Sequence, residues 1–118
     1  YGLDAATIED MLHSSQAKAR ADMELRSLQE AKVDAVQLID AIAAAVGVDA
    51  RLLEEGEGQR IDEAVAALAE ALESGTSAQL VQLTETLNRI SGDFAARRMD
   101  AHIGRALQGE SIDRVESE

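Results

Sequence analysis

The sequence ADMELRSLQEAKVDAVQLIDAIAAAV, residues 21–46, decides the fold class of this chain. Along it, side chains with an apolar body return at alternating intervals of four and three residues, which draws a narrow stripe on one side of an α-helix. Such a stripe predicts a helix that packs lengthwise against a helical partner. Its members are Ala21, Leu25, Leu28, Lys32, Ala35, Ile39, Ile42 and Val46.

The helical pattern extends well upstream of this stretch. Asp4 is a suitable N-cap, and the next strong stop signal along the chain is Gly47. The sequence therefore predicts a first helix of about forty residues, which at 1.5 Å per residue would span roughly 60 Å.

A second helix is predicted after a linker that runs from Gly47 to about Gly58, with Leu52 and Leu53 packed beneath the bundle. This helix is expected to end at Ser74, with glycine in the usual C′ position after it. Its apolar positions again follow the four-three spacing. They are Ile61, Val65, Leu68 and Leu72.

Thr76 and Gln79 resemble a capping box for a third helix that is predicted to end at Gly109. Gly92 lies inside this helix and costs roughly 1 kcal/mol relative to alanine. Two alternatives stay open: the helix continues through Gly92, or it breaks there and folds back as a short fourth helix. The predicted apolar stripe consists of Leu80, Leu83, Leu87, Ile90 and Phe94, continuing to Met99, Ile103 and Leu107.

Composition agrees with these helices. The 118 residues include no proline and two aromatic residues, and 46% of them are apolar, which favours helices over a sheet. The predicted fold class is all-α: a long N-terminal helical arm, residues 4–20, leads into an antiparallel three- to four-helix bundle, residues 21–109. A short acidic tail, residues 110–118, is expected to be mobile. We interpret the whole chain as a single helical subdomain.

The chain is strongly acidic, with 23 Asp and Glu against 11 Lys and Arg and a formal charge of -12. This charge repels nucleic acids and anionic lipid head groups, so neither is an expected partner. No signal peptide or membrane span is predicted, and the absence of cysteine is compatible with a cytoplasmic location. The chain begins at Tyr1 rather than at methionine, which suggests a fragment of a longer protein.

No catalytic, cofactor-binding or metal site is predicted. His13 and His102 lie in different helices without the spacing of metal ligands, and no phosphate-binding glycine motif occurs. An enzyme with an unrecognised site has no supporting group of residues. A basic zone near the end of the third helix is interpreted as structural, because cations suit the C-terminal end of a helix dipole. This zone consists of Arg97, Arg98, His102 and Arg105.

The predicted helix lengths are unequal in a way that bears on function. The second helix would span roughly 25 Å, so an antiparallel pair leaves the first half of the 60 Å helix without an internal partner. This overhang carries an apolar patch that is expected to dock on another domain or on another copy. The patch consists of Leu3, Ile8, Met11 and Leu12. Between patch and bundle, residues 14–21 are small and polar, so a bend there would cost little.

Residues 93–100, DFAARRMD, followed by Arg105-Ala106-Leu107, Gly109, Ser111 and Asp113, resemble the C-terminal end of the HscA family. These are DnaK-like chaperones of the 70-kDa heat-shock type that serve iron-sulfur cluster assembly. Residues 1–3 resemble the exit from that family's substrate-binding β-subdomain. Residues 8–11, 21–22 and 30–33 resemble its first two lid helices. The similarity covers nearly the whole chain and departs mainly at residues 54–58.

The resemblance implies a helical lid that closes over a client peptide held in a β-subdomain outside this chain. It further implies an ATPase domain that binds ATP and Mg²⁺, a J-domain co-chaperone, the scaffold protein IscU as peptide client, and a bacterial cytoplasmic location. Leu3, Ile8, Met11 and Leu12 are then expected to dock on the β-subdomain.

Lys32, Asp34 and Asp40 are candidates for latch contacts near the peptide cleft. For each of the three, an exposed helix charge without a partner is an equally open interpretation.

A second hypothesis, from a different class, is a free-standing helical assembly module. In this hypothesis the arm pairs with itself in an isologous homodimer. It predicts burial of the same apolar patch, and an excised lid could also dimerise through it, so the sequence leaves both hypotheses open.

Overall fold

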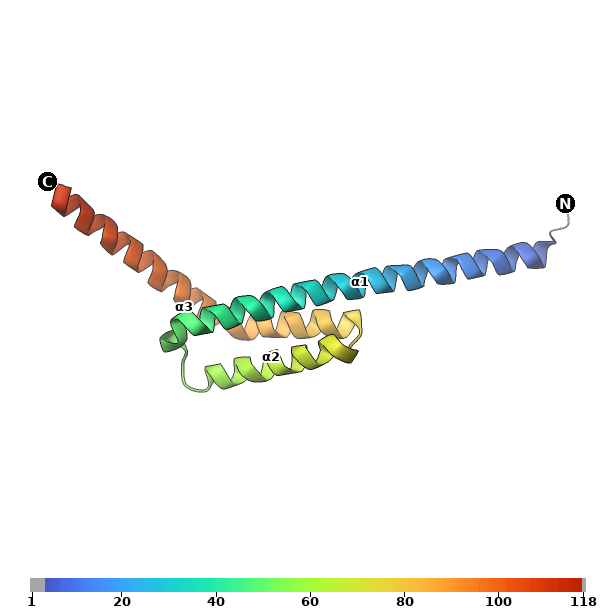
Figure 1. Ribbon diagram of the computed structural model, residues 1–118, viewed down its shortest axis with the longest axis horizontal. Helices are drawn as coiled ribbons and strands as arrows, with labels where there is room; N and C mark the ends of the chain where they lie inside the picture. The colour runs from blue at the N-terminus through green and yellow to red at the C-terminus, as the bar shows by residue number, and fades with distance from the viewer. Residues whose placement is uncertain (1–3, 118) are drawn as a thin grey trace.

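The computed structural model describes residues 4–117, with side chains described for residues 4–108. In chain order the elements are α1 (Ala5–Asp49), the short 3-10 helix η1 (Ala50–Leu52), α2 (Glu57–Ser74) and α3 (Ser77–Ser117) (Figure 1). Between residues 4 and 117 there is no strand. The predicted all-α fold class, a long helical arm leading into a helical bundle, is confirmed.

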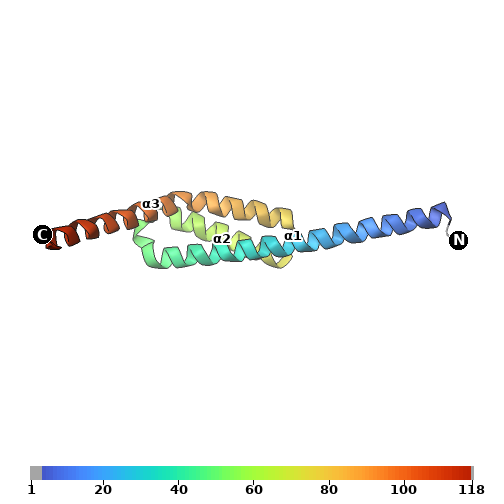
Figure 2. The same cartoon turned by 90° about the horizontal axis from the view of Figure 1, so that it is seen from above.

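The three helices form an elongated molecule with extents of 90 × 37 × 16 Å. Helices α1 and α3 run in the same direction and α2 runs antiparallel to both (Figures 1 and 2). The N-terminal half of α1 projects from one end of the bundle, and the C-terminal part of α3 projects from the other (Figure 2). The predicted overhang of the first helix is therefore confirmed, and α3 adds a second overhang at the opposite end.

The core lies where all three helices overlap. Helix α1 contributes Ala31, Ala35 and Ile42, all of them in its C-terminal half. Helices α2 and α3 contribute Ile61, Leu68, Leu80, Leu87 and Phe94. Burial of each large apolar side chain stabilises the bundle by about 1.5–3 kcal/mol. From Leu28 to Phe94, the apolar members of the predicted four-three stripes form the core or pack against it. The start of the α1 stripe is wrong: Ala21 and Leu25 are exposed, because they precede the part of α1 that the other helices cover.

Two helix starts follow the predicted capping chemistry. The amide nitrogen of Thr7 donates to the Asp4 carboxylate at 2.7 Å, so Asp4 is the N-cap of α1. The amide nitrogen of Thr76 donates to Gln79 Oε1 at 2.9 Å, and the amide nitrogen of Gln79 donates to Thr76 Oγ1 at 3.2 Å. This reciprocal capping box satisfies two amide groups that the first turn of α3 leaves without helical partners.

Two predicted stops at glycine are wrong, and the predicted end of the second helix at Ser74 is confirmed. Helix α1 continues through Gly47 to Asp49, and α3 continues through Gly109 to Ser117. Gly75 does follow the end of α2, but its backbone is extended, with φ -82° and ψ 160°, rather than left-handed. Glycine permits a left-handed helix end without imposing one. Among the residues described, only Gly56, the N-cap of α2, has a positive φ, 77°.

Gly92 does not break α3, so the alternative of a short fourth helix is not realised. The helix is continuous, and it changes direction where it leaves the bundle (Figure 1). The predicted continuation of the core stripe beyond Phe94 is wrong. Met99 follows Phe94 by five positions, a step that rotates the stripe by about 140° around the helix. Met99, Ile103 and Leu107 are consequently exposed.

The two glycines Gly92 and Gly75 are expected to respond oppositely to alanine. A Cβ atom at Gly92 meets nothing within 4 Å, so Gly92→Ala should raise the free energy of unfolding by about 0.5–1 kcal/mol. A Cβ atom at Gly75 would lie 2.6 Å from the carbonyl oxygen of Ala71, and Gly75→Ala should lower it by about 1–3 kcal/mol. Urea denaturation of both variants measures this; equal effects would contradict the assigned helix boundaries.

Candidate functional site

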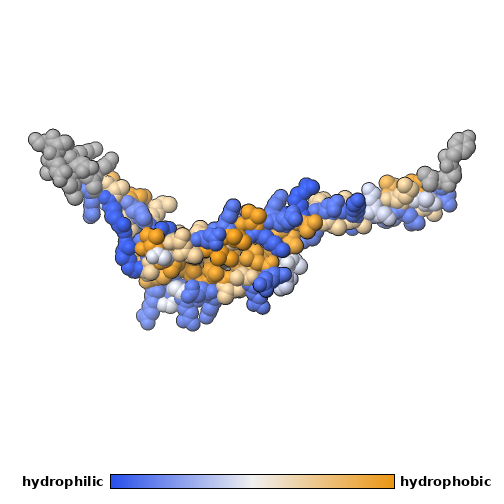
Figure 3. Space-filling model, viewed as in Figure 1, coloured by the Kyte–Doolittle hydropathy of each residue, from blue (hydrophilic) through white to orange (hydrophobic). Residues whose placement is uncertain are grey.

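The N-terminal arm of α1 presents large apolar side chains to solvent. Ile8, Met11 and Leu12 are between 46% and 59% exposed, and their spacing places them on one side of the helix. Leu3, the remaining member of the predicted patch, lies outside the described residues. No α1 residue before Ala31 is buried. Figure 3 shows hydrophobic residues at the surface near the N-terminal end of the arm. The patch therefore has no partner within the described chain.

A row of exposed apolar side chains continues from the arm along the bundle. Leu25, Val33 and Val36 are between 44% and 55% exposed. Met11 and Val36 are 25 residues apart, which is within about 20° of a whole number of helical turns. Val36 is turned by about 100–140° from the buried Ala31, Ala35 and Ile42. We call the resulting surface the outer face of α1. It consists of Ile8, Met11, Leu25, Val33 and Val36.

The three candidate latch residues do not share one surface. Lys32, Val36 and Asp40 follow one another at intervals of four residues, so Lys32 and Asp40 flank Val36 on the outer face. Asp34 is turned by about 200° from Lys32. It lines instead a shallow hollow of about 220 Å³ between α1 and α3, together with Val81 and Glu85. A partner that binds one surface of α1 can therefore contact both Lys32 and Asp40, but not Asp34 as well.

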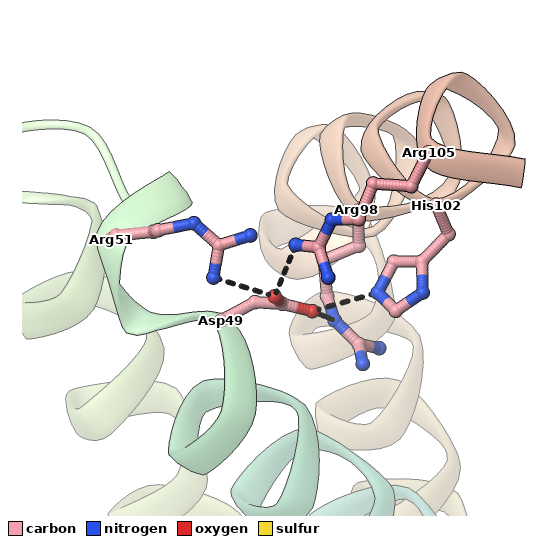
Figure 4. A network of polar contacts seen from close by, with 5 residues as sticks. All are labelled: Asp49, Arg51, Arg98, His102 and Arg105. Atoms are coloured by element: carbon pink, nitrogen blue, oxygen red, sulfur yellow. Dashed lines mark hydrogen bonds and ion pairs between the residues drawn. The ribbon is translucent and has the colours of Figure 1, made fainter. Parts of the chain in front are cut away.

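A second polar centre, which the sequence did not predict as such, lies where α1 ends. The Asp49 carboxylate is fully buried and is surrounded by cationic groups from η1 and α3 (Figure 4). Arg98 Nε donates to Asp49 Oδ2 at 2.8 Å, and His102 Nε2 lies 3.0 Å from the same oxygen. Arg51 Nη1 donates to Oδ1 at 3.1 Å, and Arg105 Nη2 lies 3.9 Å from it.

This arrangement keeps Asp49 ionised. Burial of an unpaired carboxylate is costly, and the C-terminal end of a helix dipole also disfavours negative charge. The hydrogen bond with His102, followed by that from Arg98, outweighs burial and lowers the pKa of Asp49 from 3.8 to about 2. A sequence signal for the cluster exists: Arg98, His102 and Arg105 follow four-three spacing, so they lie on one side of α3. Nothing in the sequence indicates which carboxylate they meet.

Arg97 makes a parallel connection to the start of α2. Its guanidinium forms a close ion pair with the buried Glu57 and donates from Nε to the carbonyl oxygen of Leu52 at 2.9 Å. Burial raises the pKa of Glu57, but the hydrogen bonds from Arg97 and from the Glu54 amide, together with the positive charges of Arg97 and Arg60, outweigh it, so the pKa lies below its ordinary value. The neighbours Arg97 and Arg98 thus hold both ends of the loop between α1 and α2. The basic zone is structural, as predicted, but through specific ion pairs.

The side chains described for residues 4–108 provide no recognisable metal centre. They contain no group of three or more His, Cys, Asp or Glu residues that could hold a metal ion. No helix in the described part of the chain is long and apolar enough to cross a membrane.

Asp49→Asn is expected to remove a pH-dependent part of the stability. Because the pKa of Asp49 is about 2 in the folded chain and 3.8 ordinarily, the ionised carboxylate stabilises the fold above about pH 4, and this contribution is lost as the pH falls through 2. The wild type should therefore be the more stable protein at pH 5–7, and the difference should shrink between pH 4 and 2. Thermal unfolding across this range measures it.

Asp40→Asn is the matched control, because Asp40 is exposed and should change stability by no more than about 0.5 kcal/mol. A difference between wild type and Asp49→Asn that stays constant down to pH 2 would contradict the assigned role of Asp49.

Comparison with known proteins places this helical chain in a family. The model of the family described as Hsp70 protein matches residues 1–100. The chaperone protein HscA of Serratia proteamaculans is 42% identical over 115 residues, which cover 98% of this chain. The HscA proteins of Citrobacter koseri and of Escherichia coli O6:H1 are 38% and 37% identical to it, also over 115 residues and 98% of this chain.

The chain spans 19% of the length of these relatives, and the part that it matches is their C-terminal part. Both the family match and the relatives confirm the resemblance that residues 93–113 indicated. The chain belongs to the Hsp70 family of chaperones and is similar to the C-terminal part of HscA.

Proposed function

We propose that this chain is the helical lid of the substrate-binding domain of an HscA-like chaperone, closing over a client peptide that a β-subdomain holds. The observation that carries the proposal is the outer face of α1. Five large apolar side chains lie exposed on the side of this helix that faces away from its own bundle.

The two sides of α1 support different tasks. Its inner side is occupied by the bundle core around Ala35 and Ile42. Its outer face continues from the arm to Val36, beyond the point at which burial begins at Ala31. The five side chains are 44–58% exposed, so a partner would bury roughly half of each, and each would contribute roughly half of the 1.5–3 kcal/mol that complete burial gives. Their sum acts against the loss of translational and rotational freedom on association. A lid needs such a surface, together with a bundle that keeps the helix straight behind it.

Polar contacts from the same face suit reversible closure. Lys32 and Asp40 lie on either side of Val36, and we assign them to the latch of the closed lid. Exposed ion pairs contribute about 0.2–1 kcal/mol each, which is small enough for a lid that has to reopen. Asp34, on another side of α1, is not assigned to the latch.

The remaining parts of the cycle belong to the longer protein. We assign ATP and Mg²⁺ binding to an ATPase domain outside this chain, the scaffold protein IscU to the role of client, and stimulation of hydrolysis to a J-domain co-chaperone. The bacterial cytoplasm is the location that this assignment implies. No catalytic step is assigned to the chain itself.

Self-association through the outer face is the competing function. A free-standing assembly module would bury the same side chains in an isologous homodimer. Light scattering on the chain alone measures its oligomeric state and distinguishes the two functions. A tight homodimer that does not bind the β-subdomain would contradict the lid proposal and support the assembly module.

Met11→Glu is expected to weaken binding of the chain to the separately produced β-subdomain of its parent. Wild type should bind, and more tightly in the presence of an IscU-derived peptide. A carboxylate buried in the docked arm should weaken binding at least about tenfold, equivalent to 1.4 kcal/mol. Titration calorimetry measures this. Met99→Glu makes the same change at an exposed position of α3 and is the control; equal losses for both variants would contradict docking through the outer face.

Lys32→Ala combined with Asp40→Ala is expected to accelerate peptide release from the full-length chaperone by about two- to fivefold, as the loss of weak exposed contacts implies. Release of a fluorescent peptide in the ADP state measures the rate. Asp34→Ala is the matched control and should leave the rate unchanged. An effect of Asp34→Ala as large as that of the double variant would refute the assigned latch surface.

A further inference from the structure

The far end of the bundle concentrates more positive charge than its single carboxylate neutralises. Arg51, Arg98 and Arg105 all lie within 4.0 Å of Asp49, at 3.1, 2.8 and 3.9 Å. Among the described side chains, no other carboxylate lies within ion-pairing distance of any of these three arginines. The group therefore carries a formal charge of about +2 with His102 neutral, although the whole chain carries -12. We call Arg51, Arg98, His102 and Arg105 the cationic cluster.

The helix dipole does not remove this excess. The C-terminal end of α1 is equivalent to roughly half a negative charge, so an excess of about 1.5 positive charges remains. Stabilisation of Asp49 itself already uses the two closest groups, Arg98 and His102. The positive charges of Arg51 and Arg105 therefore exceed what is needed to compensate the buried Asp49 carboxylate.

The unused donors of the cationic cluster face solvent. The side chains of Arg51 and Arg105 are 56% and 57% exposed. Arg51 donates to Asp49 through Nη1, and Arg105 lies too far from Asp49 for a hydrogen bond. A guanidinium presents five N–H donors in a planar fork that matches a carboxylate. Figure 4 shows Arg51 of η1 and Arg105 of α3 approaching one carboxylate oxygen of Asp49, while Arg98 and His102 contact the other.

We propose that the cationic cluster binds a carboxylate of an acidic peptide segment in a partner protein. The chain's overall charge disfavours extended polyanions such as nucleic acids, which span many Debye lengths, but a single acidic side chain interacts mainly within one Debye length of about 8–10 Å. Val48, which precedes Asp49 in the sequence, is also exposed and offers an apolar contact to a peptide. These features select an acidic peptide over a polyanion.

This binding site is independent of the lid proposal. The arm and the cationic cluster lie at opposite ends of α1, which occupies much of the 90 Å length of the molecule (Figure 1). A partner bound at Arg51 and Arg105 leaves the outer face near Ile8 and Met11 free. Loss of one interaction therefore carries no consequence for the other.

The test is a titration of the ¹⁵N-labelled chain, followed by NMR through the arginine Nε–H signals. The probe is a tetraglutamate peptide with both ends blocked; blocked tetraglutamine and inorganic phosphate are the comparison ligands. We expect saturable shifts at Arg51, Arg98 and Arg105 with tetraglutamate, none with tetraglutamine, and none at Arg20 in the arm. Affinity should fall as ionic strength rises.

Arg51→Gln is expected to weaken tetraglutamate binding at least fivefold, and Arg51→Lys should recover part of it, because lysine retains the charge but not the planar fork. Both variants keep Arg98 and His102 on Asp49, and thermal unfolding verifies the fold. Arg20→Gln is the matched control. Shifts of equal size at Arg20, shifts with tetraglutamine, or binding of phosphate without tetraglutamate would each overturn the proposal.

Discussion

The ionised carboxylate of Asp49 fixes how the three helices meet. It is fully buried at the last residue of α1 and is bound by Arg98 and His102 of α3 and by Arg51 of η1. Together with Arg97, which holds the start of α2, this contact sets the register of α3 against α1 and closes the loop between α1 and α2. Apolar packing alone defines such a register weakly, because neighbouring turns of a leucine-rich stripe are nearly equivalent. The outer face of α1 is presented by a bundle that this carboxylate keeps aligned.

The sequence predicted those features that depend on helical periodicity. Four-three spacing indicated the three helices and the core between Leu28 and Phe94, and the local chemistry of Asp4 and Thr76 indicated two helix starts. It did not predict the end of α1, since a glycine such as Gly47 allows a helix to continue when nothing forces it to stop. The exposure of Met99 follows from one five-residue step that breaks the spacing. Local pattern indicated the apolar patch that includes Met11 and Leu12, and both side chains are exposed. The link between Asp49 and Arg98 joins residues 49 positions apart, which no local pattern specifies.

Helix α1 uses different sides for folding and for exposed apolar groups. Its inner side builds the core, and its outer face and arm carry apolar groups that the bundle does not use. Membership of the Hsp70 family gives this division a biological context, because the matched relatives are chaperones about five times longer than this chain. Apolar side chains that the bundle leaves largely exposed, such as Val36, are therefore the ones from which a function can be inferred.

The unbroken helix α1 also has a mechanical consequence. Its 45 residues correspond to a rod about 68 Å long at 1.5 Å per residue. A rotation of only 10° at the free end of the arm would displace the far end by about 12 Å if the rod stays straight. Helix α1 runs without interruption through residues 14–21, where the sequence predicts that a bend costs little. As long as these residues stay helical, a small angular change at one end of α1 becomes a large translation at the other. The bundle lies at the C-terminal end of α1 and would move with it. Because the bundle is slender, it meets little resistance from solvent.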